Sequence, residues 1–91
     1  MKQSKLDPTT VKNLTRCNNA MAGFYKIYHF YPEGFPYENQ KENLWAMEEH
    51  KLLNWDKINK YIDERCIMQL ISTEIVPAYR KLQKLANLKT Q

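Results

Sequence analysis

Two cysteines and two histidines give this 91-residue chain the number of ligands that a structural zinc site uses. The nearest two, Cys17 and His29, stand twelve positions apart, and His50 and Cys66 follow at larger distances. Structural zinc sites usually take their ligands in close pairs, because a short turn places both side chains on one side of the metal. The spacing therefore predicts no metal site, and no other pattern in the chain calls for a cofactor.

Carboxylates stand side by side at Glu48-Glu49 and at Asp63-Glu64, and carboxylates are common general acids and bases. Neighbouring positions on a helix point about 100° apart, so neither pair converges on one substrate. Neither cysteine belongs to a Cys-x-x-Cys motif, and the chain has no glycine-rich phosphate loop and no Gly-x-Ser-x-Gly turn. We therefore predict no catalytic residue and no enzyme activity of the chain's own. This prediction is compatible with the chain being a non-catalytic subunit of an enzyme complex.

Basic residues outnumber acidic residues by four. In the second half of the chain they alternate with Tyr and Trp, a mixture that can contact phosphates and stack on bases. The same mixture describes a solvated helix face whose lysines extend into water. Only three of the fourteen basic residues are arginine, whose planar fork binds phosphate bidentately. A small basic nucleic-acid-binding or regulatory protein is therefore the alternative interpretation, through Lys51, Lys57, Lys60, Arg65, Arg80, Lys81, Lys84 and Lys89.

The segment from Phe24 to Tyr37 is the strongest indication of function. Seven of its fourteen residues are Phe or Tyr, and His29 adds an eighth aromatic ring. Aromatic residues this dense cannot all face one core, and such side chains are favoured at protein interfaces. One interpretation is a loop that folds back over the protein's own core. The other is a partner-binding surface made of Phe24, Tyr25, Lys26, Tyr28, Phe30, Tyr31, Phe35 and Tyr37.

The elements that would position these groups follow from the apolar residues, which recur at three- and four-residue steps. This spacing is typical of amphipathic helices. The chain has only two glycines and four prolines, which favours long helices over many short strands. The sequence thus predicts an all-α fold of one domain, residues 1–91, with an aromatic loop at 31–38 and helices over roughly 8–30, 40–53, 55–71 and 76–88.

Local signals indicate where these helices begin. Asp7 before Pro8 is typical of an N-cap followed by proline in the first turn, and Asn39 and Asn54 stand where two further helices begin. Gly23, within the first helix, predicts a close crossing with another helix.

The last boundary between predicted helices is expected between residues 71 and 76, where the third helix ends and the fourth begins. Ser72-Thr73 interrupts the apolar spacing of the third helix, and Val76-Pro77 predicts a new helix start, because the residue before a proline avoids helical angles.

Three further stretches form a pattern with defined distances between them. They are Ala22-Gly23-Phe24-Tyr25-Lys26-Ile27, Lys57-Ile58-Asn59-Lys60-Tyr61-Ile62-Asp63 and Gln69-Leu70-Ile71. The pattern resembles subunit seven of mitochondrial ubiquinol–cytochrome c reductase, complex III. That family shows Ala-Gly-aromatic-x-Lys-Leu, then basic-Ile-x-basic-x-apolar-Asp, then Gln with two apolar residues.

The resemblance implies a non-catalytic helical subunit on the matrix side of the mitochondrial inner membrane, part of a respiratory electron-transport complex. Its partners would be other protein subunits, with peripheral membrane contact and no transmembrane segment of its own. Without the resemblance, the expected location is the cytoplasm. The residues themselves favour an accessory or structural subunit that docks into a larger protein assembly.

Overall fold

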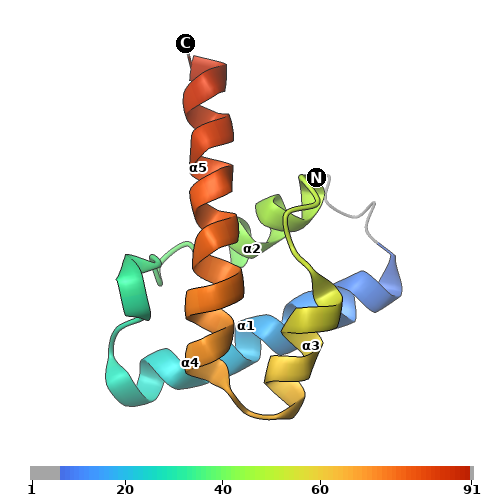
Figure 1. Ribbon diagram of the computed structural model, residues 1–91, viewed down its shortest axis with the longest axis vertical. Coiled ribbons are helices and arrows are strands. Elements are labelled where there is room, and N and C mark those ends of the chain that lie inside the picture. The colour runs from blue at the N-terminus through green and yellow to red at the C-terminus, as the bar shows by residue number, and fades with distance from the viewer. Residues whose placement is uncertain (1–6, 91) are drawn as a thin grey trace.

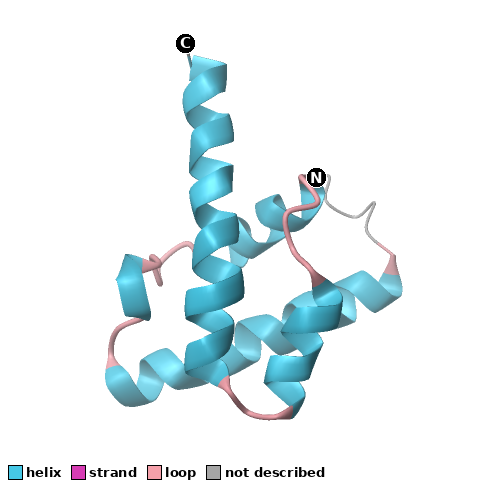
Figure 2. Ribbon diagram, viewed as in Figure 1, coloured by secondary structure: helices cyan, strands magenta, loops and turns pink. Residues whose placement is uncertain are grey.

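The computed structural model describes residues 7–90, and all regular structure among them is helical (Figures 1 and 2). The helices are α1 (Pro8–Tyr28), α2 (Gln40–Glu49), α3 (Trp55–Asp63), α4 (Ile67–Leu70) and α5 (Val76–Thr90). A short 3-10 turn, η2 (Pro32–Gly34), lies in the aromatic loop, and a π-helical turn, η3 (Ile71–Ile75), joins α4 to α5 without a break. The prediction of an all-α fold with four helices is confirmed, since α4, η3 and α5 form one continuous rod.

Side-chain caps start two of the helices as the sequence predicts. The Asp7 carboxylate accepts a hydrogen bond of 3.0 Å from the Thr10 backbone N–H, with Pro8 in the first turn of α1. Asn54 caps α3 in the same way, and its side-chain oxygen accepts from the Lys57 N–H at 3.3 Å. Asn39 occupies the N-cap position of α2 as predicted, but its side chain makes no capping hydrogen bond.

Three helices are each followed, within two residues of their last residue, by a non-glycine residue with a left-handed backbone. These residues are His29 (φ 66°), Lys51 (φ 59°) and Arg65 (φ 62°). After α3, the Cys66 N–H donates to the Tyr61 carbonyl at 2.9 Å, the long hydrogen bond of a Schellman motif. Glycine usually occupies such a position because it has no Cβ to clash, so the sequence carries no stop signal at these three places.

The first two helices therefore end earlier in the chain than predicted, and the end predicted for the third helix is at the wrong residue. The helix expected over 8–30 ends at Tyr28, and the one over 40–53 ends at Glu49. The helix expected over 55–71 is wrong as one element, because the chain turns at residues 64–66.

The helix predicted over 76–88 corresponds to α5, but the interruption expected before Val76-Pro77 is wrong, because the helix continues from η3 into α5. Proline lacks an N–H, and in an α-helix its ring clashes with the carbonyl four residues earlier. The π-helical turn widens the helix immediately before Pro77 and provides room for that ring. The hydroxyls of Ser72 and Thr73 donate to the carbonyls of Met68 (2.9 Å) and Gln69 (2.6 Å). Both hydroxyls are thereby satisfied within the helix and do not have to interrupt it.

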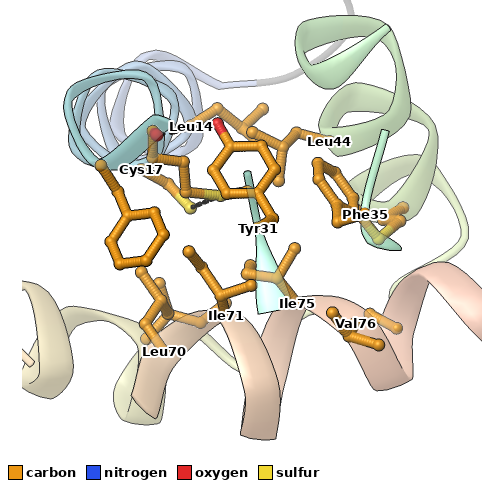
Figure 3. Packing of buried hydrophobic residues seen from close by; sticks show 14 residues of the cluster. Leu14, Cys17, Tyr31, Phe35, Leu44, Leu70, Ile71, Ile75 and Val76 are labelled. Atoms are coloured by element: carbon orange, nitrogen blue, oxygen red, sulfur yellow. Dashed lines mark hydrogen bonds between the residues drawn. The ribbon is translucent and has the colours of Figure 1, made fainter. Parts of the chain in front are cut away.

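The rod crosses α1, and its outer turns rise beyond the rest of the described fold (Figure 1). Helix α1 contacts α2, α3 and α4, and α2 also packs on α5. Figure 3 shows the core between them, with Tyr31 from the aromatic loop inserted above Ile71 and Ile75. The buried apolar residues are Leu14, Cys17, Met21, Phe24, Tyr31, Phe35, Leu44, Met47, Ile58, Leu70, Ile71, Ile75, Val76 and Ala78.

Gly23 is exposed, and a Cβ built on it would meet no atom within 4 Å, so the predicted close helix crossing is wrong. Glycine inside a helix costs about 0.5–1 kcal/mol relative to alanine. The substitution Gly23→Ala is therefore expected to raise the free energy of unfolding by about this amount. Urea unfolding followed by circular dichroism measures it. A decrease in stability would contradict the open surroundings of this position.

Candidate docking surface

The aromatic segment divides between the core and the surface. Phe24, Tyr31 and Phe35 are buried, each at 7% exposure or less. The prediction that these three residues belong to a partner-binding surface is therefore wrong, because they lie in the protein's own core. The interpretation of a loop folded over the core is right for them.

Tyr31 connects the aromatic loop to two helices. Its hydroxyl lies 2.7 Å from the Met21 carbonyl oxygen and also contacts Oε1 of Gln40, which is buried. The Gln40 side-chain amide in turn donates to the Asn18 carbonyl at 3.0 Å. Burial raises the pKa of the Tyr31 phenol, so the hydroxyl keeps its proton and remains a donor. The loop is thereby held to both α1 and α2.

Three large apolar side chains lie exposed where α1 ends, and we name Ile27, Tyr28 and Phe30 the α1 apolar end. Their exposed fractions are 70%, 54% and 53%. The Phe24 ring supports two of them, with ring centroids 4.7 Å from Tyr28 and 6.2 Å from Phe30. The left-handed turn at His29 places Phe30 back against Phe24. Tyr28 and Phe30 of the α1 apolar end are therefore exposed to water on one side and packed against Phe24 on the other.

A stacked pair of tyrosines lies beside the α1 apolar end. The rings of Tyr25 and Tyr37 are parallel within 6°, with centroids 4.0 Å apart. They form one wall of a shallow open hollow, whose other lining includes Gly23, Lys26 and His29. Lys26 and Tyr37 are exposed and Tyr25 is half-buried, so these predicted residues lie at the surface.

Ile27 is the residue of this surface that the sequence-based prediction missed. It follows Phe24 by three positions, which is the spacing of the core stripe of α1. The structure exposes it because α1 ends one residue later, before any element covers this side of the helix. No signal in the sequence marks that early end.

The side chains considered for acid–base chemistry serve the fold. Glu48 is buried, accepts a 3.0 Å hydrogen bond from the Trp55 indole N–H and lies 3.6 Å from the Lys51 ammonium. Asp63 pairs with Arg16 at 2.7 Å, which ties α3 to α1. The Glu48 partners Lys51 and Trp55 line a shallow open hollow, which the Glu48 carboxylate itself does not line.

The four residues considered as zinc ligands differ in their surroundings. Cys17 is buried in the core, whereas His29, His50 and Cys66 are exposed, and both cysteines are free thiols. Among the residues that the structure describes, no three His, Cys, Asp or Glu side chains gather as a metal ion would require.

No described helix combines the length and apolar character needed to cross a membrane. Comparison of the chain with protein-family models, with curated proteins and with solved structures finds no match.

Proposed function

We propose that this protein is a non-catalytic accessory subunit that docks into a larger protein assembly through the α1 apolar end. The observation that carries the proposal is the exposure of Ile27, Tyr28 and Phe30, each more than half open to water. Exposed large apolar side chains that lie together mark interaction sites in small proteins. Lys26 and the Tyr25–Tyr37 pair, which line a shallow hollow near the same end of α1, would supply polar groups at the edge of such an interface.

The bracing of the α1 apolar end favours tight docking. A side chain that is already held against a neighbour loses less conformational freedom on binding. Phe24 holds Tyr28 and Phe30 in this way, and Phe24 itself stacks on the buried Tyr31 ring at 6.1 Å. The aromatic surface is thus continuous with the core, and its shape is set before a partner arrives.

The resemblance to subunit seven provides one candidate for the assembly. On that basis we propose a mitochondrial respiratory complex of the complex III type, with this chain on the matrix side of the inner membrane. The support is the pattern at Ala22–Ile27, Lys57–Asp63 and Gln69–Ile71. The docking proposal does not depend on this identification.

The test expresses the tagged chain in its source cells and separates detergent extracts on native gels. We expect the protein to migrate with a complex much larger than its own 10.9 kDa. The double variant Tyr28→Ser/Phe30→Ser is expected to leave that complex, because truncating an interface hot spot costs about 2 kcal/mol or more, roughly 30-fold in affinity. Probing the same gel for cytochrome b tests the complex III identification separately.

Met68→Ser is the matched control, since Met68 is 52% exposed but lies on α4, outside the aromatic segment. We expect it to stay in the complex. A wild-type chain that migrates alone, or a double variant that folds and still migrates with the complex, would contradict docking through the α1 apolar end.

A further inference from the structure

The C-terminal helix carries the whole net charge of the protein. The stretch Val76–Thr90 contains Arg80, Lys81, Lys84 and Lys89 and no acidic residue. The ten basic and ten acidic residues in the rest of the chain balance each other. The positive field of the molecule is therefore concentrated on α5.

Three cationic residues of α5, Arg80, Lys81 and Lys84, are exposed on the side that faces away from the fold. Tyr79 and Leu82 pack against the core, and Ala78 is buried within it. Arg80, Lys81, Gln83, Lys84 and Asn87 are all exposed. Four of them follow the spacing i, i+3, i+4 and i+7, which places them on one face of the helix.

We call this set the outward face of α5: Arg80, Lys81, Gln83, Lys84 and Asn87. Its members are cationic or amide side chains without a carboxylate, and the small exposed Ala86 lines a hollow together with four of them. Lys81 and Lys84 pair with no acidic side chain in the part of the chain that the structure describes. The outer turns of α5 also rise clear of the other described elements, so a large partner can approach (Figure 1).

The composition of this face decides between classes of partner. A second copy of α5 would oppose cations to cations, because the helix has no carboxylate to pair with them. A membrane surface would require the leucine side of the helix to face lipid, and Leu82 on that side already packs on the core. Protein interfaces are depleted in lysine, whereas interfaces with DNA are polar and strongly positive.

We propose that the outward face of α5 binds double-stranded DNA, with the helix in the major groove. The groove is about 12 Å wide and admits an α-helix of about 10–12 Å diameter. Lys81 and Lys84 would contact phosphates or guanine edges, and the side-chain amide of Gln83 matches the donor and acceptor pattern of adenine. This site is separate from the α1 apolar end and does not depend on the docking proposal.

The test uses the full chain and a labelled mixed-sequence DNA duplex, with binding followed by fluorescence anisotropy at 50 and 200 mM salt. Three phosphate contacts predict a log–log slope of about −2.7, or roughly 40-fold weaker binding at the higher salt. Replacing Lys81 and Lys84 by glutamine together should reduce the slope by about 2 and weaken binding at 50 mM salt by at least about tenfold.

The matched control replaces Lys57 and Lys60, two exposed lysines of α3, by glutamine. It makes the same change in net charge and should alter DNA binding less than about twofold, since long-range charge alone is screened by salt. Circular dichroism of both variants checks that the helices remain. An A-form RNA duplex, whose deep major groove excludes a helix, should bind more weakly than DNA.

Several results would overturn the proposal. One is no binding to DNA at 50 mM salt. Another is an equal loss of DNA affinity in the α5 and α3 double variants, and a third is equal affinity for the RNA and DNA duplexes. Tighter binding to phosphatidylglycerol vesicles or to polyglutamate than to DNA would also overturn it, and would assign the face to a membrane or to an acidic protein.

Discussion

Replacing Ile71 by alanine is expected to remove about 2–5 kcal/mol from the free energy of unfolding. Ile71 is fully buried in the π-helical turn and lies in the core between α1 and the rod, beside Tyr31 (Figure 3). Truncating it removes apolar contact and leaves a cavity that the packed helices cannot fill. A domain of this size has a free energy of unfolding of about 5–14 kcal/mol, so the substitution would remove a large share of that stability.

Urea unfolding followed by circular dichroism measures this loss as a shift of the midpoint. Met68→Ala is the control, because Met68 begins the same rod but is 52% exposed. It should change stability by less than about 0.5 kcal/mol. Equal effects of the two substitutions would contradict the inward orientation of the π-helical turn.

Raising the pH from about 9 to about 12 is expected to destabilise the protein through Cys17, by on the order of 1 kcal/mol per pH unit. Burial raises the pKa of this thiol from 9.0 to about 12. Above pH 9 the unfolded chain therefore releases a proton that the folded chain retains, which favours unfolding. The stabilisation is complete below pH 9 and declines as the pH rises toward 12. The raised pKa of Tyr31 acts in the same direction.

The measurement is a series of urea unfolding curves at pH 8, 9, 10 and 11, for the wild type and for Cys17→Ala. The variant starts less stable, because it leaves a cavity, but its stability should fall less steeply with pH. Cys66→Ala is the control, since Cys66 is exposed in the folded chain and its removal should leave the slope unchanged. Identical slopes for the wild type and Cys17→Ala would contradict the burial of the thiol.

Interactions within a few residues of each other could be predicted from the sequence alone. The caps at Asp7 and Asn54 join side chains to backbone groups three positions away, so their geometry depends on little else. The buried stripe of α1, Leu14, Cys17 and Met21, follows from the period of the helix. The all-α class follows from such stripes together with few glycines and prolines.

The helix ends could not be predicted, because long-range packing selects them. His29, Lys51 and Arg65 adopt left-handed angles that their own preferences disfavour. The surrounding fold over-determines these turns, since each directs the chain back toward the core. The passage of the rod through Pro77 has the same origin, because Ile71 and Ile75, the first and last residues of the π-helical turn, are buried in the core.

The aromatic segment shows the same division within fourteen residues. Composition is enough to show that Phe24–Tyr37 is too rich in aromatic rings for one core face. The folded chain selects Tyr31 and Phe35 for the core and leaves Tyr28 and Phe30 in water. That choice depends on where α1 stops and on which helices the loop crosses, and both are set by contacts between residues distant in the chain.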